Sequence, residues 1–449
     1  MAFATIVGTT IEWYDFFIYA NAAGLVFASL FFEPAGSQIG LLIAFASVGL
    51  SFLFRPLGAF LAGHYGDKIG RKAMLVITLV LMGGATTLIG VLPTYETAGV
   101  LAPILLLVLR IIQGISAGGE WGGAALMAVE HAPANRRGLF GAFPQLGVPL
   151  GMLLASGMLA LMSGVISPGD AFIEWGWRVP FLVSFVLIIV GMVVRRSVDE
   201  SPVFQEIAEK KQQTKVPIVE LFRRHWLLVL IAAVVFAGNN AAGYMITGGF
   251  VLSYATDPAG DLAMDRTEVL VAVTAAAFLW FVFTLVSGFL ADILGRRRTY
   301  IIGFLCVALT VFPLFWLIDT GNIQALFLGL ALLSVGLGLT YGPQAALYSE
   351  VFPASVRFSG VSISYALGAI IGGAFAPTIA TALVQATGTS ASVSTYLLIF
   401  ALLSLAAVAL LRDRPGIDLS IHNQAEQEVG ATVFDKRRAP AVVRERMDA

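Results

Sequence analysis

The feature that most constrains this chain is a series of apolar runs, each long enough to cross a lipid bilayer as a helix. Such a helix needs about 20 mostly apolar residues. Only 12% of the 449 residues are charged, whereas soluble domains carry about a quarter. We therefore predict an all-α integral membrane protein. Its twelve predicted spans lie near residues 4–32, 39–63, 73–92, 100–128, 139–163, 177–196, 226–255, 269–291, 299–318, 323–348, 359–385 and 393–411.

The short loops between these spans differ in charge. Loops after the second, fourth and eighth spans are basic, and those after the first, third, seventh and ninth are mainly acidic. Because Lys and Arg mark the cytoplasmic side, we expect the basic loops and both termini to face the cytoplasm. The first span carries acids and follows no basic stretch, which argues against a cleavable signal peptide and leaves open a start further upstream.

Two loop patterns occur twice in the chain. G-x3-D-x2-G-R-[RK] occupies residues 63–72 and 288–297, and E-x2-P-x3-R occupies residues 130–137 and 350–357. The chain is therefore two copies of a six-span unit, a plan in which transporters bind their substrate between the halves. The predicted domains are a first bundle (1–196), a central cytoplasmic loop (197–224), a second bundle (225–411) and a polar cytoplasmic tail (412–449), which we expect to be flexible.

In the first duplicated pattern, Asp67 lies at a helix end and Arg71 and Lys72 lie in the loop, where they can pair across the cytoplasmic gap and separate when the halves rock. An alternative is that the basic residues only anchor the topology. On the first interpretation the cytoplasmic gate consists of Gly63, Asp67, Gly70, Arg71, Lys72, Glu130, Arg137, Asp292, Arg296, Arg297, Glu350 and Arg357.

With these motifs the chain resembles the major facilitator superfamily, and within it the metabolite–proton symporter family. The likeness covers nearly the whole chain and is carried by EWYDF at 12–16, RPLG at 55–58, RIIQG at 110–114, GGEWGG at 118–123, WGWRVPF at 175–181 and DESPVF at 199–204. It implies proton-coupled uptake of a small organic acid or zwitterion: shikimate, oxoglutarate, citrate, another dicarboxylate, an aromatic acid, or proline and betaine.

Two departures from superfamily patterns refine this expectation. The second copy of the loop motif has Ile293 where a base is usual, which implies a weaker gate in the second half. The fifth span lacks the Gly-Pro-rich pattern of drug–proton antiporters, and the tail lacks the coiled coil of osmosensing members. Drug efflux and osmosensing are therefore disfavoured.

The predicted spans of the first half contain charges at bilayer depth. Such a charge costs at least ~2.5–3.5 kcal/mol on insertion scales, so it needs a partner or a function. We assign proton coupling to Glu12, Asp15, Arg110 and Glu120, and solute binding to Tyr19, Arg55, Arg110 and Gln113. One bound proton would remove the excess negative charge of three acids over two arginines. A freed arginine would then bind a substrate carboxylate through paired hydrogen bonds. The alternative is that these charges form salt bridges that fix helix packing.

Embedded polar residues of the second half are uncharged. We assign solute recognition to Asn239, Asn240, Tyr341 and Gln344. Each of these side chains, taken singly, is also explained by a hydrogen bond between helices. The two asparagines are adjacent, so they point to different sides of one helix and at most one faces the pathway.

Several other functions are disfavoured by the sequence. A net charge of −1 does not suit a nucleic-acid surface, the four histidines lack metal-ligand spacing, and there is no P-loop. We expect no enzyme activity, no metal and no cofactor, and a monomer whose partners are a small solute, the proton and the lipid bilayer. A channel or scaffold would not require paired gates. A uniporter, an antiporter or exporter, and sodium in place of the proton stay open.

Overall fold

The computed structural model describes residues 2–69, 71–196, 217–247, 249–258 and 260–431. Within these ranges all regular structure is helical. Eleven helices are long and apolar enough to cross a membrane, and the shorter apolar helix Val76–Gly90 occupies the position predicted for the third span. The all-α membrane fold predicted from the apolar runs is confirmed, and the spans begin and end within about ten residues of their predicted limits.

The first half contains six long helical segments, called rods here, and several of them consist of two or more consecutive helices. In order they are α1 (Ala2–Ala22) with η1 (Ala23–Phe27) and α2 (Ala28–Phe31); α3 (Ser37–Ile69); α4 (Arg71–Gly90); α6 (Leu101–Ala117) with α7 (Glu120–Glu130); α8 (Arg137–Leu161) with η4 (Met162–Ile166); and η5 (Phe172–Gly176) with α9 (Arg178–Arg196). Short turns η2 (Glu33–Ala35), α5 (Tyr95–Ala98) and η3 (Ala134–Arg136) connect them.

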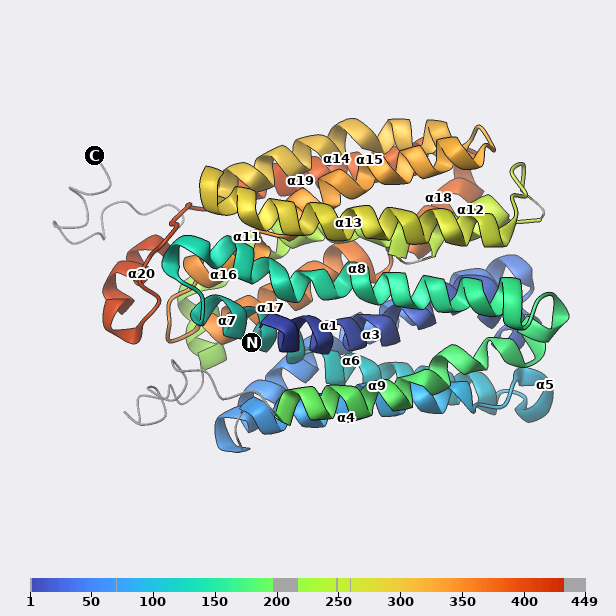
Figure 1. The fold of residues 1–449 in the computed structure, drawn as a ribbon, viewed down its shortest axis with the longest axis horizontal. Helices are drawn as coiled ribbons and strands as arrows, with labels where there is room; N and C mark the ends of the chain where they lie inside the picture. Colours follow the sequence, from blue (N-terminus) through green and yellow to red (C-terminus); the bar gives the residue numbers. More distant parts are fainter. Residues whose placement is uncertain (1, 70, 197–216, 248, 259, 432–449) are drawn as a thin grey trace.

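The second half repeats this plan. Its rods are α11 (Pro217–Thr247) with α12 (Phe250–Thr256); α13 (Arg266–Leu294); α14 (Arg296–Ile318); α15 (Ile323–Tyr341) with α16 (Gln344–Val351); α17 (Arg357–Ala369), η6 (Ile370–Ala374) and α18 (Ala376–Thr387); and α19 (Ala391–Leu410). Most rods run along the long axis of the molecule, with α8 of the first half beside α13 of the second (Figure 1). The N-terminus and α20 lie at the same end, which also carries the basic loops and is called here the basic end.

The fourth and tenth spans are interrupted at matching positions of the repeat. The fourth breaks at Gly118–Gly119, between α6 and α7, and the tenth breaks at Gly342–Pro343, between α15 and α16. The halves of both broken spans at the basic end, α7 and α16, contact each other. Interrupted helices at the interface of two repeats are typical of transporter binding sites.

Glycines allow α3 and α6 to pack with their backbones in contact. A Cβ atom on Gly114 would lie 2.1 Å from Ser51 O, and one on Gly118 would lie 2.0 Å from Arg55 O. Small residues at such spacing let membrane helices approach closely. A Cβ on Gly122, one turn further, would instead lie 2.0 Å from Ser362 Oγ of the second half. The glycine stripe thus serves packing within the first half and then contact between the halves.

Two predictions about polar segments need correction. The central loop was expected to reach residue 224, but α11 begins at Pro217 and is kinked at His225, whose φ is −126°. The tail was expected to be flexible, but residues 412–431 fold back on the basic end and include η7 (Ile421–Asn423) and α20 (Gln424–Ala431). Hydrogen bonds to buried gate residues order this polar segment without a large apolar core. Residues 197–216 and 432–449 lie outside the described ranges.

Candidate functional site

Aromatic side chains from both halves meet where the broken spans face each other. Trp121 of α7 stacks on Tyr365 of α17 with ring centroids 3.9 Å apart, and Phe236 of α11 stacks on the same tyrosine at 4.2 Å. Phe16 of α1 meets Tyr244 of α11 edge-on at 5.7 Å. We call this set the central aromatic layer. It forms the apolar part of the interface at which a repeat transporter holds its solute.

Arg55 lies in this layer. Its guanidinium carbon is 4.3 Å from the ring centroid of Phe52, 5.5 Å from Trp13 and 5.6 Å from Phe16. Only 2% of the residue is exposed. Cation–π contact with three rings stabilises a desolvated guanidinium, and its Nε has no hydrogen-bond partner among the described residues. The structure therefore leaves Arg55 with a donor available at the interface between the halves.

Arg110 is held by hydrogen bonds to neighbouring oxygen atoms. It donates through Nη1 to Gln113 Oε1 at 2.7 Å, and through Nη2 to Ser51 Oγ at 3.0 Å and to Val48 O at 3.1 Å. Its guanidinium lies over Tyr19, 3.8 Å from the ring centroid. These contacts stay within the first half and occupy the donors that a substrate carboxylate would need. For Arg110 and its neighbours, the geometry favours the alternative that the group fixes helix packing.

Gln113 and Tyr19 belong to the same internal network. Gln113 Nε2 donates to Thr86 Oγ1 at 2.7 Å, and the Tyr19 hydroxyl pairs with Ser47 Oγ at 2.7 Å. Both side chains are buried. Their assignment to solute binding therefore stays a prediction that no contact in the structure supports.

Asp15 is buried inside the first bundle, away from the aromatic layer. Ser184 of α9 donates to its Oδ1 at 2.5 Å, and the carboxyl faces Gly83 of α4. Among the described residues no base lies within ion-pair distance of it. Glu12 and Glu120 are also buried, and each makes polar or charged contacts. Asp15 therefore makes no ion pair with an arginine among the described residues.

The two adjacent asparagines face different ways. Asn239 Nδ2 donates to Thr340 Oγ1 at 2.6 Å and to Leu337 O at 3.3 Å, both inside the second half. Asn240 Nδ2 and the Tyr244 hydroxyl are buried and, in the described part of the chain, have no hydrogen-bond partner. A Cβ on Gly373 would lie within 2.9 Å of both side chains. Asn240 and Tyr244 thus form a polar spot beside the aromatic layer.

Gln145 is a site residue that the sequence analysis missed. Its Oε1 accepts from Trp121 Nε1 at 2.8 Å, and its Nε2 donates to Gln344 Oε1 at 3.1 Å and to Tyr341 O at 3.2 Å. One buried amide thereby joins α7, α8 and the break in the tenth span. In the sequence it is a single amide in an apolar span, eight residues after Arg137, and no motif marks it.

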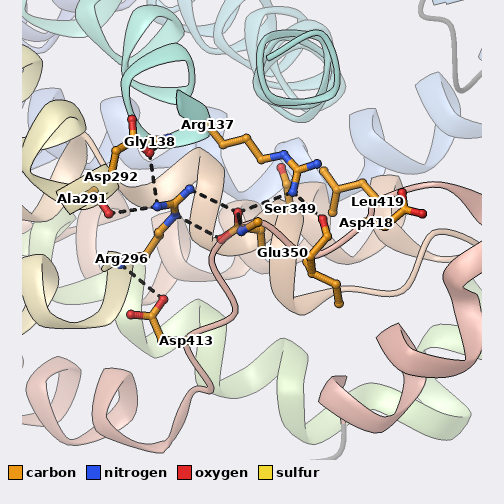
Figure 2. A network of polar contacts seen from close by, with 12 residues as sticks. Arg137, Gly138, Ala291, Asp292, Arg296, Ser349, Glu350, Asp413, Asp418 and Leu419 are labelled. Carbon is orange, nitrogen blue, oxygen red and sulfur yellow. Dashed lines mark hydrogen bonds and ion pairs between the residues drawn. The ribbon is translucent and has the colours of Figure 1, made fainter. Parts of the chain in front are cut away.

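The predicted gate is closed at the basic end (Figure 2). Arg137 of the first half lies 3.7 Å from Glu350 of the second, and Arg357 of the second lies 3.7 Å from Glu130 of the first. The acid of each E-x2-P-x3-R copy therefore pairs with the base of the other copy. All four side chains are nearly or fully buried. These ion pairs join the halves through the second duplicated pattern.

Asp292 and Arg296 of the second loop motif support these pairs. Asp292 accepts from the backbone N–H of Gly138 at 2.7 Å and of Leu139 at 2.9 Å, at the first turn of α8. Arg296 lies 3.2 Å from Asp292 and 3.1 Å from Glu350. A carboxylate at a helix N-terminus is stabilised by the helix dipole. Among the described residues, Arg297 contacts this network through its backbone N–H, which donates to Asp413. Of the other predicted gate residues, Gly63 lies in α3, whereas Gly70 and the side chains of Asp67, Arg71 and Lys72 lie outside the described part of the chain.

A groove of about 590 Å³ opens between α8 and α13 on the flank of the molecule. It is lined by apolar residues such as Leu153, Val271 and Phe327, and by Phe278, which is 55% exposed. An apolar groove on a lipid-facing flank offers no group to orient a polar solute. The candidate site is therefore the buried interface around Arg55.

Comparison with known proteins agrees with this geometry. Residues 1–216 match the family model described as "Sugar (and other) transporter", and residues 240–443 match that of the Major Facilitator Superfamily. The inner membrane metabolite transport protein YhjE of Escherichia coli is 41% identical over 91% of this chain and 93% of its own length. The chain belongs to the major facilitator superfamily.

Two further relatives and one solved structure indicate what kind of superfamily member this chain resembles. The shikimate transporter of Escherichia coli is 37% identical over 92% of this chain and 94% of its own length. The proline/betaine transporter of Salmonella typhimurium is 32% identical over 90% of this chain and 81% of its own. The solved proton:xylose symporter XylE superposes with a TM-score of 0.75, covering 93% of this chain and 96% of XylE at 18% identity, which shows the shared fold. The chain is thus a multi-pass metabolite transporter and not an enzyme.

The buried gate pairs yield a prediction about stability. Glu130→Gln leaves Arg357 without its carboxylate partner in a desolvated site, which costs about 3–5 kcal/mol for fully buried pairs. We expect the purified protein in detergent to melt at a clearly lower temperature. Glu220→Gln is the matched control, because Glu220 pairs with Arg224, which is 63% exposed, and exposed pairs contribute about 0–1 kcal/mol. Equal melting shifts for the two variants would contradict a stabilising cross-pair.

Proposed function

We propose that this superfamily member is a proton-coupled symporter that takes up a small metabolite carrying a carboxylate. The observation that carries the proposal is the position of Arg55: buried between aromatic rings at the interface of the halves, with Nε unpaired. A guanidinium with a spare donor binds a carboxylate through charge-assisted hydrogen bonds. The names of the shikimate and proline/betaine relatives support this class of solute, since all three solutes carry a carboxylate.

The polar spot of the second half complements this arginine. Asn240 and Tyr244 project buried, unpartnered donors beside the aromatic layer. Leaving such groups without a partner costs about 1–3 kcal/mol each, and a bound hydroxyl or carbonyl removes that cost. We therefore assign the carboxylate to Arg55 and the remaining polar groups of the solute to Asn240 and Tyr244.

Asp15 is the proposed proton site. Its carboxyl is buried with no base within ion-pair distance among the described residues, and Ser184 donates a hydrogen bond to it. Loss of its proton would create a charge between α1, α4 and α9 and so change the packing of the first bundle. No cofactor is needed, because the proton gradient supplies the energy. We place the basic end in the cytoplasm of the bacterial inner membrane by the positive-inside rule, and expect the protein to act as a monomer.

Transport by proteoliposomes tests the coupling. With an imposed pH gradient and labelled shikimate, proline or a dicarboxylate as probes, we expect the wild type to accumulate at least one probe uphill. Asp15→Asn should abolish accumulation but keep exchange of labelled for unlabelled solute, because the substitution mimics the protonated acid. Asp261→Asn, in an exposed loop, is the control and should transport normally. Full accumulation by Asp15→Asn, or accumulation driven only by sodium, would refute the proposal.

The two arginines are distinguished by a second prediction. Arg55→Lys keeps the positive charge but loses the planar fork, so we expect KM for carboxylate probes to rise at least about tenfold, the equivalent of 1.4 kcal/mol. Arg110→Lys should instead lower the melting temperature, because it leaves Gln113 and Ser51 without their donor. Kinetics in proteoliposomes and melting in detergent separate the two effects. An unchanged KM for Arg55→Lys would exclude Arg55 as the carboxylate ligand.

A further inference from the structure

The polar segment 412–431 packs against the gate at the basic end (Figure 1). Its first contact is Asp413, whose carboxylate accepts from the backbone N–H groups of Arg296 at 3.3 Å and Arg297 at 3.2 Å, at the N-terminus of α14. Its last turn is attached through Glu428, 3.3 Å from His225 at the kink of α11. The hydrogen bond from His225 holds the pKa of Glu428 below its usual range. The segment is therefore anchored at both ends to the second half.

Gln427 is the central anchor of this segment. Its Oε1 accepts from the backbone N–H of Ala354 at 2.7 Å and from Arg357 Nη2 at 2.9 Å. Its Nε2 donates to the carbonyls of Asp418 and Ser420, both at 2.8 Å. The residue is 2% exposed. One buried side chain thus connects the loop at 418–420, α20 and a gate arginine.

The same segment reaches the first half through the gate. Arg137 Nη1 donates to Ile417 O, in addition to its ion pair with Glu350. On the other side of the gate, Arg357 Nη1 donates to Leu419 O at 2.9 Å. Two backbone carbonyls of the tail, two residues apart, are thus held by one arginine from each half, and the contact with Arg137 exists only while the halves are together at this end.

The tail also orients the acid of the gate. The backbone N–H of Gly416 donates to Glu350 Oε1 at 3.4 Å, the carboxylate that faces Arg137 (Figure 2). Both second-half members of the cross-pairs, Glu350 and Arg357, are therefore held by tail atoms as well as by the first half. When the halves separate at the basic end, the tail keeps its contacts to the second half and loses Arg137.

We propose that residues 412–431 form an intramolecular latch that stabilises the closed basic end and must release Arg137 in every transport cycle. The latch adds a contact between the halves that the transmembrane helices alone do not supply. Weakening its attachment shifts the population toward the state open at this end, because only the closed state gains from the contact. This inference goes beyond the proposed transport function and does not depend on which solute is carried.

Cysteine accessibility tests the latch. Ser349 lies beside Glu350, is fully buried, and sits within the gate network (Figure 2). In a Cys306→Ser background, Ser349→Cys should react slowly with a maleimide in purified full-length protein, in the absence of solute. We expect Gln427→Ala to raise this rate at least about tenfold, the order expected for losing one buried hydrogen bond to a charged group. Asp413→Ala, at the other end of the segment, should raise it in the same direction.

Ala425→Ser, at an exposed position of the same helix, is the matched control and should leave the rate unchanged. Gel filtration and melting in detergent report whether each variant is folded. If Gln427→Ala does not fold, the labelling rate in Asp413→Ala tests the proposal. Rates equal to the control in folded Gln427→Ala and Asp413→Ala would overturn the proposal. Because no solute is present, that result would leave the assignments of Arg55 and Asp15 untouched.

Discussion

Desolvated charge is the constraint on which the rest of this structure depends. A charge at bilayer depth is costly, and the molecule meets that cost in three ways. At the basic end, Glu130 and Glu350 pair with arginines of the opposite half. At the level of the site, Arg110 is satisfied by neutral oxygens of its own half, whereas Arg55 is surrounded by aromatic rings at the interface. The first arrangement links the halves at the basic end, and the second holds helices of one bundle together. The third places a charge at the interface, where we propose that the solute carboxylate binds.

Duplication explains why the gate works as a unit. Each E-x2-P-x3-R copy contains an acid and a base. The acid of one copy pairs with the base of the other, which gives two equivalent ion pairs related by the repeat. Breaking one bridge leaves buried charges without partners, so the two are expected to open together. The tail adds a third link between the halves, which comes from the segment that follows the second half.

The sequence was sufficient for the features that depend on periodicity and repetition. Span positions, the two halves and the four residues of the cross-pairs follow from apolar runs and duplicated motifs. It was insufficient where the outcome depends on which face of a helix meets which neighbour. In the sequence, Arg55 and Arg110 are both embedded bases, but only Arg55 lies at the interface between the halves. Asn239 and Asn240 are adjacent amides, but only Asn240 faces that interface. Gln145 was missed because a single amide has no pattern. The tail was misjudged because its order comes from gate arginines more than 50 residues away in sequence.

The central claim is that one buried carboxyl in the first half exchanges a proton as the solute binds in the interface. Direct measurement of proton uptake tests it most plainly. Purified protein in weakly buffered detergent solution, with a pH indicator and at a pH high enough for Asp15 to be ionised before solute is added, should take up protons when a carboxylate solute binds. Asp15→Asn should bind the same solute without that uptake. Equal proton uptake by the wild type and Asp15→Asn would contradict the account.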